Sequence, residues 1–322
     1  MLDDIRAGTL GGCVVVWDLD LSRSRSCETA RMKMDAVEHE LQSIFLVSGR
    51  SALENVQAWA FGARVLITRH RAPAELPAQL GQLVAAAVTA ALKLTVATLD
   101  NAFSALALNK PISHPQILRS ASFLVDAVND VGISGWLDQA WEIDELTSQH
   151  CVMVAGVVAG YALHLGLPSR DVLDLTCAAI LHDIGKAKVP LSILNKPGKL
   201  NDEERAIIES HPRTGWNCLR RQGFGDSRVL DAILHHHEYL DGSGYPDGLC
   251  GDEVTDFARI ITLCDIFSAL LERRPYKPPR DPDVALEIMR AMHGKIDQDL
   301  FREFSRFVSL TFPRQSREIA AV

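Results

Sequence analysis

The sequence predicts an α+β protein in two parts, a small α/β region followed by an all-helical region. Over residues 1–76, short β-branched runs alternate with segments of helical spacing, which is typical of a small parallel sheet. From Pro77 on, apolar residues recur every three or four positions, the spacing of helices with one apolar face. With 322 residues, of which 47% are hydrophobic, the chain is long enough for two cores.

The first part is expected to contain buried strands that alternate with helices. The strand candidates are "CVVVWDLDL", "SIFLVSG" and "ARVLITR", each of which ends in turn or polar residues. The helix candidates are "CETARMKMDAVEHELQ" and "SALENVQAWAFG", and Gly62 ends the second.

The second part begins with a long apolar stripe made of Leu80, Val84, Val88, Leu92, Val96, Leu99, Phe103 and Leu106. Residues 77–112 are therefore expected to form a helical linker, whose stripe either packs within the chain or pairs with a second copy in a homodimer. After the prolines of "NKPISHP", helices are expected over "QILRSASFLVDAVNDVG", "DELTSQHCVMVAGVVAGYALHLG", "RDVLDLTCAAILHDIG", "DEERAIIESHPRTGWNCLRRQG", "SRVLDAILHHHEYL", "DFARIITLCDIFSALLERR" and "PDVALEIMRAM".

Charge and cysteine usage narrow the class of protein. A net charge of −8 disfavours DNA, RNA and anionic membranes as partners, although a local basic cluster can still hold a small anion. The seven cysteines are scattered and form no CxxC pair, which favours a reducing, cytoplasmic setting. Lys93 interrupts the apolar run from Leu80 to Leu99, so no membrane span is expected there.

Histidines and aspartates mark the helical part as a candidate metal site. His182 and Asp183 are adjacent at the end of an apolar helix, where both can reach one ion only if it lies close over the helix end. A single such pair is more simply a polar helix terminus, but further histidines and an aspartate recur at apolar positions. The candidate ligands are His150, His182, Asp183, His211, His236, His237 and Asp265. Mixed imidazole and carboxylate donors in a helix bundle suit iron, manganese or zinc, and this number of ligands suits two ions that share a carboxylate.

Four motifs, in order, resemble the HD-GYP subgroup of the HD-superfamily phosphohydrolases. They are "HDIGK" (182–186), "HP" (211–212), "HHEYLDGSGYP" (236–246) and "CDIFSALLERRPYK" (264–277), and "ILNKPGKL" fits between the first two. The resemblance runs from about Ser113 to Phe312, so residues 113–322 are expected to form one all-helical HD-GYP domain.

The resemblance implies a cyclic di-GMP phosphodiesterase that acts at a metal centre, and the donor types suit two divalent transition-metal ions, iron, manganese or others. One ion would be held by His150, His182, Asp183 and Asp265, and Asp183 would bridge to a second ion on His211, His236 and His237. A third-metal glutamate of some relatives is replaced by Leu146, beside Glu145, which favours a dinuclear site and linear pGpG rather than GMP as the product.

The same resemblance assigns further roles. Two metal ions activate a bridging water and neutralise charge on the phosphoryl group. Asp183 and Lys186 are the expected catalytic residues, and Lys186 is also expected to contact phosphate. The expected substrate contacts are Arg274, Lys277, Asp241, Gly244 and Tyr245. Tyr245 contacts a guanine or a partner protein, or only packs its loop, and Glu238 is expected to orient a metal ligand.

The remaining histidines have no motif around them. His235 is interpreted as a surface or helix-face residue, and His70, His114, His164 and His293 as exposed or ordinary polar residues. The alternatives to the enzyme are a signalling module that binds the dinucleotide or a protein without turnover, and hydrolysis of another nucleotide or phosphomonoester.

The N-terminal part resembles the second half of a response-regulator receiver domain. Asp18 or Asp20 lies near the phosphoacceptor position, Ser48 near the hydroxyl position and Arg69 near that of the usual lysine. A receiver needs two more strands and an acidic pair before the phosphoacceptor, and too little chain precedes Asp18. Residues 1–76 are therefore expected to be a degenerate receiver for dimerisation or for docking a signalling partner.

Overall fold

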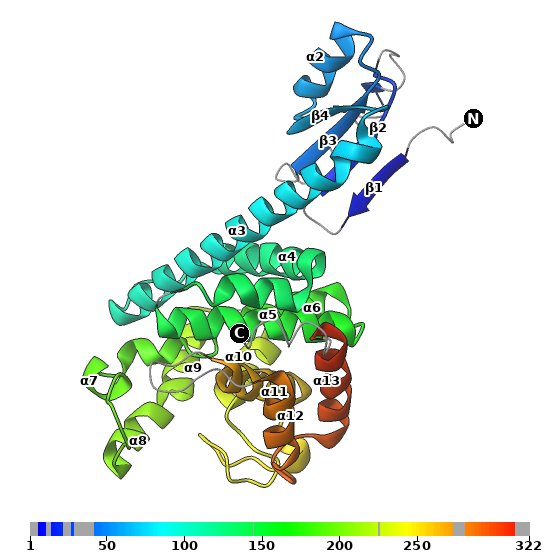
Figure 1. Ribbon diagram of the computed structural model, residues 1–322. Helices are drawn as coiled ribbons and strands as arrows, with labels where there is room; N and C mark the ends of the chain where they lie inside the picture. Colours follow the sequence, from blue (N-terminus) through cyan, green and yellow to red (C-terminus); the bar gives the residue numbers. More distant parts are fainter. Residues whose placement is uncertain are drawn as a thin grey trace. The chain divides into compact units, whose positions relative to one another are not determined.

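The computed structural model describes residues 6–10, 14–21, 27–28, 42–143, 145–224, 226–272 and 281–312. The chain divides into two compact units, one of Met1–Ala90 with Asn129–Val131 and one of Ala91–Val128 with Gly132–Val322. This division falls inside one long helix, α3 (Ala72–Ala107), which covers most of the predicted linker (Figure 1).

The N-terminal unit is a four-stranded sheet in the order β1 (Arg6–Leu10), β2 (Val14–Asp18), β3 (Gln42–Val47), β4 (Val65–Thr68). The strands β2, β3 and β4 are parallel, which confirms the predicted small parallel sheet. The strand β1 pairs antiparallel with β2 and was missed, because "RAGTL" carries no apolar run. The helix α2 (Ala52–Ala60) lies where predicted, whereas the helix predicted over residues 27–42 lies mostly outside the described residues.

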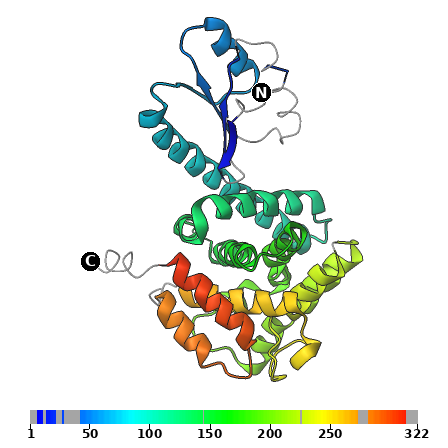
Figure 2. The ribbon, with the colours of Figure 1, turned by 90° about the vertical axis from the view of Figure 1, so that its right-hand side faces the viewer.

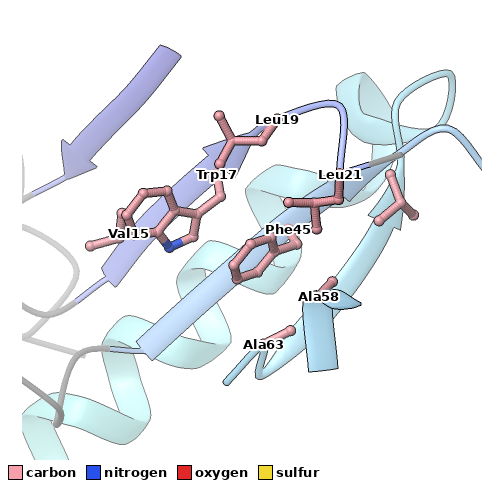
Figure 3. Close-up of a cluster of buried hydrophobic side chains, with 8 residues drawn as sticks. Val15, Trp17, Leu19, Leu21, Phe45, Ala58 and Ala63 are labelled. Atoms are coloured by element: carbon pink, nitrogen blue, oxygen red, sulfur yellow. The ribbon is translucent and has the colours of Figure 1, made fainter. Parts of the chain in front are cut away.

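Both faces of this sheet are covered. On one face, Trp17 and Phe45 stack with ring centroids 5.8 Å apart and pack with Leu19, Leu21 and Ala58 of α2 (Figure 3). On the other face, a second buried cluster joins Ile44 and Ile67 to Leu83 of α3, and partly buried Leu80 and Val84 pack against it. The start of the apolar stripe therefore packs within the chain.

The second unit is helical (Figures 1 and 2). Its elements after α3 are α4 (His114–Ala140), α5 (Leu146–His164), α6 (Ser169–Leu181), η1 (Ile184–Lys188), α7 (Leu191–Leu194), α8 (Asp202–Glu209), α9 (His211–Arg221), α10 (Ser227–His235), η2 (Gly251–Glu253), α11 (Asp256–Leu271), α12 (Pro282–Arg290) and α13 (Gln298–Thr311). The helix α5 is buried from Cys151 to Ala162 and packs against α6 and α11, so it forms the centre of this unit. The predicted all-helical character of this part is confirmed.

Two predicted helices end earlier than expected. The segment predicted as one helix from Asp202 is split at Ser210 into α8 and α9. Pro212 explains the break, because proline has no N–H to donate and fits the first turn of a new helix. The helix α6 ends at Leu181, so His182 is its C-cap and Asp183 lies just beyond it, with φ −95°.

Two helices, α3 and α5, are long and apolar enough to cross a membrane by length and composition alone. The apolar window of α5 is 78% buried within the structure, and that of α3 is 22% buried.

Candidate metal centre

Three helix ends and the interiors of two helices bring the seven predicted ligands together. His182 and Asp183 follow α6, His211 begins α9, His236 and His237 follow α10, and His150 and Asp265 lie within α5 and α11. Ligand atoms of Asp183, His211, His236 and His237 lie within 4.8 Å of one another, and so do those of His150, His182 and Asp183. Asp183 belongs to both groups. Asp265 joins the second group, because its Oδ1 lies 2.9 Å from His150 Nε2.

Asp183 lies between imidazoles on both sides. Its Oδ1 is 3.0 Å from His211 Nε2, and its Oδ2 is 3.4 Å from His182 Nε2 and 3.7 Å from His150 Nε2. His211 Nε2 is in turn 3.3 Å from His236 Nε2. His237 turns Nδ1 toward Asp265 Oδ2, 3.6 Å away. The nitrogens and oxygens thus face a common interior rather than separate pockets.

A contact between Nδ1 and a backbone carbonyl orients three of these rings. Nδ1 of His182 lies 2.7 Å from Ala179 O, Nδ1 of His211 lies 2.7 Å from Ile208 O, and Nδ1 of His236 lies 2.8 Å from Ile233 O. Each carbonyl is three residues earlier, in the last turn of a helix, where carbonyls lack helical partners. A carbonyl only accepts, so Nδ1 carries the proton and Nε2 keeps a lone pair. The helix ends therefore fix the tautomer that binds metal ions.

Some buried polar atoms of this cluster have no hydrogen-bond partner within the described ranges. Asp183, His182 and His236 have no exposed surface, and Asp265 is 7% exposed. Among the residues that the structure describes, His182 Nε2 and Asp183 Oδ1 are buried and make no hydrogen bond of good geometry. Orphaned buried atoms of this kind are costly, and a cation that accepts both lone pairs removes the cost. The donor set therefore fits divalent iron, manganese or zinc.

The pKa shifts of two carboxylates and two imidazoles agree with ligand roles, whereas the effect of burial on the His182 imidazole is outweighed by Asp183, which raises the pKa of that ring. Burial alone would raise the pKa of Asp183, but the Lys186 ammonium and the His182 ring hold it well below its usual range. Burial also opposes ionisation of Asp265, yet its contact with His150 lowers the pKa of that carboxyl. Burial and the surrounding rings lower the pKa of His236 well below 6.5, and burial lowers that of His237 to about 3. Both carboxylates are thus charged and both imidazoles neutral at pH 7.

Lys186 reaches the cluster from η1. Its Nζ donates to Asp183 Oδ2 over 2.6 Å, and the side chain is 21% exposed. A Cβ atom at Gly185 would meet the backbone of His211 and Gly215, so only glycine lets η1 pack directly on α9. The "HDIGK" motif thus supplies two candidate ligands, a close backbone contact and a lysine at the edge of the cluster.

Glu238 holds the signature loop rather than orienting a metal ligand, which corrects the sequence-based expectation. Its carboxylate accepts the N–H groups of Asp247 at 2.7 Å, Gly248 at 3.0 Å and Leu249 at 3.2 Å. Backbone donors at these distances anchor the far end of the loop to the turn that carries His236 and His237.

His235 is not a surface residue, contrary to the sequence-based interpretation. It is 9% exposed, with Nδ1 2.9 Å from Asp231 Oδ1 and Nε2 3.1 Å from Asp247 Oδ2. Asp247 also pairs with Arg213. Burial opposes protonation, but the two carboxylates raise the pKa of His235. This histidine therefore joins α10 to the signature loop and faces away from the metal ligands.

The remaining predicted contacts fall in two groups. The centroid of the Tyr245 ring lies 4.7 Å from the ring centroid of His237 and 6.4 Å from that of His211, so Tyr245 borders the cluster. Asp241 is exposed and accepts the N–H and hydroxyl of Ser243, which shapes the turn around Gly244. Arg274 and Lys277 lie outside the described residues. His70, His114, His164 and His293 belong to neither ligand group.

A second polar cluster lies in the N-terminal unit. Arg69 Nε donates to Asp18 Oδ1 over 2.7 Å, and a terminal nitrogen donates to Leu19 O over 2.8 Å. Arg69 also lies 3.6 Å from Glu54, a fully buried residue that accepts the hydroxyl and the N–H of Ser48. Glu54 was not predicted to belong to this cluster, because nothing in "SALENVQAWAFG" distinguishes a buried glutamate from an exposed one.

Known proteins are similar to this chain in sequence and in fold. The family described as "HD domain" matches residues 137–300. A cyclic di-GMP phosphodiesterase of Pseudomonas aeruginosa is 39% identical over 167 residues, which cover 52% of this chain and 40% of that relative. A 3′3′-cGAMP-specific phosphodiesterase of Vibrio cholerae is 38% identical over 159 residues, which cover 49% of this chain and 37% of that relative.

The chain thus spans less than half the length of both relatives. Among solved structures, an HDG"Y"P protein of Bdellovibrio bacteriovorus superposes with a TM-score of 0.55 and 20% identity, over 67% of this chain and 70% of that one. With a family match over about half of its length, the chain belongs to the HD domain family.

Proposed function

We propose that this protein is a metal-dependent phosphodiesterase that hydrolyses cyclic di-GMP to linear pGpG. The position of Asp183 supports this most strongly, because one buried carboxylate lies in both groups of ligand atoms. The names of the relatives support the substrate class, a cyclic dinucleotide.

Two divalent ions, iron or manganese, are proposed to occupy the cluster. His150, His182, Asp183 and Asp265 would hold one, and Asp183, His211, His236 and His237 the other. Such a pair supplies an activated water and neutralises charge on the phosphoryl group. The Nδ1–carbonyl contacts hold three Nε2 atoms in place beforehand, so the ligand geometry needs little rearrangement on binding.

The chain's own residues are proposed to position the substrate. Lys186, at the edge of the cluster, places a positive charge where a phosphoryl oxygen would gain negative charge. Tyr245 borders the same space and restricts its entrance. Roles for Asp241 and Gly244, and for Arg274 and Lys277 outside the described residues, stay predictions.

A dinuclear site and pGpG as the product are proposed from the start of α5. Leu146, where a third-metal glutamate would stand, is 43% exposed and offers no ligand atom. Glu145 is the N-cap of α5, where its carboxylate accepts Ser148 N–H. The described cysteines are not in disulfides, which is compatible with the proposed cytoplasmic setting, and pairing with a second copy or a signalling partner stays a prediction.

Product chromatography after anaerobic purification tests the proposal. We expect pGpG to accumulate from cyclic di-GMP, and His182→Ala to abolish its formation, because that ring contributes to the shared site. His114→Ala is the matched control, since this histidine stacks on Phe224 outside both ligand groups. A wild-type protein that carries metal and binds cyclic di-GMP without forming product would favour the alternative, a non-catalytic signalling module.

A further inference from the structure

A cavity of about 450 Å³ lies beside the metal cluster in the helical unit. Its walls come from the C-terminal half of α3, the start of α5, η1 and α7, and they include Asp100, Phe103, Glu145, Ser148, Lys186 and Leu191. Cavities of this size typically hold small-molecule ligands. Nothing in the proposed reaction has yet used these residues, apart from Lys186.

Lys186 connects this cavity to the metal cluster. It lines the cavity, and its Nζ is 2.6 Å from Asp183 Oδ2. A ligand in the cavity would therefore lie within one side-chain length of a phosphate at the metal centre.

Two exposed carboxylates, those of Asp100 and Glu145, line the cavity. Ser148 donates its hydroxyl to Asp100 Oδ1 over 3.1 Å and its N–H to Glu145 Oε2. Within the part of the chain that the structure describes, each carboxylate accepts through one oxygen, and its other oxygen can accept from a ligand. Two carboxylates repel phosphate, so the part of a nucleotide that suits this cavity is not its phosphodiester.

The apolar walls suit a flat ring. Phe103, Leu191 and Leu194 line the same space and offer surfaces against which a base can pack. Guanine presents two adjacent N–H donors, N1–H and N2–H, which match one carboxylate. Adenine presents a lone pair at N1, which a carboxylate repels.

We infer that this cavity binds one guanine base of the cyclic dinucleotide, with the Asp100 and Glu145 carboxylates accepting its N–H groups. The inference rests on the proposed function, because the base enters the cavity while its phosphate lies at the metal centre. It assigns Asp100 and Glu145 to base selectivity, and it gives Lys186 a place between base and phosphate.

The test compares cyclic di-GMP with cyclic di-AMP, which lacks guanine. The ratio of their kcat/KM values is measured for the wild type, Asp100→Asn and Glu145→Gln, all as metal-loaded full chains. We expect the preference for cyclic di-GMP to fall about tenfold or more in at least one variant, because an amide cannot accept two N–H bonds as a carboxylate does. Glu142→Gln is the matched control, an exposed acid that does not line the cavity, and should keep the wild-type ratio.

The outcomes separate the inference from the proposed function. If the wild type hydrolyses cyclic di-GMP and both cavity variants keep its ratio, the guanine assignment is wrong and the enzyme assignment stands. If the wild type hydrolyses neither dinucleotide, the proposed function fails, and the ratio of dissociation constants from calorimetry then tests the cavity alone. A mere folding defect would lower both rates together and leave the ratio unchanged, which would also count against the inference.

Discussion

The two units of this protein each gather acidic side chains in one place, but they neutralise them differently. In the N-terminal unit, Arg69 pairs with Asp18 and lies near buried Glu54. In the helical unit, Asp183 and Asp265 face imidazoles. Lys186 is the permanently charged group that contacts Asp183 among the residues that the structure describes. In the described part of the chain, each cluster contains a buried carboxylate oxygen without a hydrogen bond, Glu54 Oε1 in the first and Asp183 Oδ1 in the second. Glu54 Oε1 lies 3.6 Å from the Arg69 guanidinium, whereas Asp183 Oδ1 faces the imidazole of His211.

This difference separates a structural cluster from a functional one. Arginine is protonated at every accessible pH, so Arg69 satisfies its neighbours permanently. Imidazoles with depressed pKa values, such as those of His236 and His237, offer lone pairs instead of charge. A cluster that is rich in such lone pairs is complete only when it holds a metal ion.

The largest expected effect comes from removing the shared carboxylate. Asp183→Ala should lose both metal ions and reduce dinucleotide hydrolysis by about 1,000-fold or more, because each ligand group loses a member. Elemental analysis and product chromatography measure the two effects. Asp202→Ala, at an exposed position of α8, is the control. Full metal content in Asp183→Ala would show that this residue does not bridge.

Adjacent histidines should respond in opposite ways. His236→Ala should lose metal with little loss of the fold, whereas His235→Ala should keep its metal and lose about 1–3 kcal/mol of unfolding free energy, because His235 bonds to two carboxylates. Metal analysis and urea unfolding separate the two. Equal metal loss in both variants would contradict the assignment of His236 to the metal cluster and of His235 to the contact with the signature loop.

Arg69→Ala tests the N-terminal cluster. Without Arg69, buried Glu54 and half-buried Asp18 lose their counter-charge, and we expect that unit to lose about 2–3 kcal/mol of stability. Hydrogen exchange of peptides from residues 42–68 reports this loss, and metal content should not change. Slower or unchanged exchange would show that Arg69 is not a structural counter-ion.

The smallest effect concerns Asp231, which holds His235. Burial alone would raise the pKa of Asp231, but hydrogen bonds with His235 and Thr255 lower it. Because the pKa of Asp231 is lower in the folded than in the unfolded state, its ionised carboxylate stabilises the fold above the unfolded pKa near 4. This stabilisation is lost as the pH falls through the folded pKa. The stability difference between wild type and Asp231→Asn should therefore be below about 1 kcal/mol at pH 7 and shrink below about pH 4.

Chemical unfolding at several pH values measures this difference, and the His235→Asn background provides the comparison. The pH-dependent part of the stability difference caused by Asp231→Asn should decrease when His235 is absent. An identical pH dependence in both backgrounds would contradict the contact.

Much of the metal cluster was predictable, because its residues stand in spaced motifs. His211 stands directly before Pro212, which lies in the first turn of α9, so its position at a helix end follows from a local rule. The opposite orientations of His235 and His236 could not be read from "HHHE", since they depend on where α10 ends.

Long-range contacts were the part that sequence patterns did not reveal. Asp100 and Glu145 share a cavity with Lys186 although no motif links them, and Glu54 meets Arg69 only through the sheet. The strand β1 also escaped prediction, because it is recognisable only by its pairing with β2. Such features follow from the packing of distant segments rather than from local periodicity.

Anomalous diffraction from crystals of the anaerobically purified protein tests the central claim most directly. Data collected at the iron and manganese edges should show two ions, one on each side of the Asp183 carboxylate, with the imidazoles of His150 and His182 near one and those of His211 and His236 near the other. An ion bound elsewhere, or a metal-loaded crystal with no ion beside Asp183, would contradict the account.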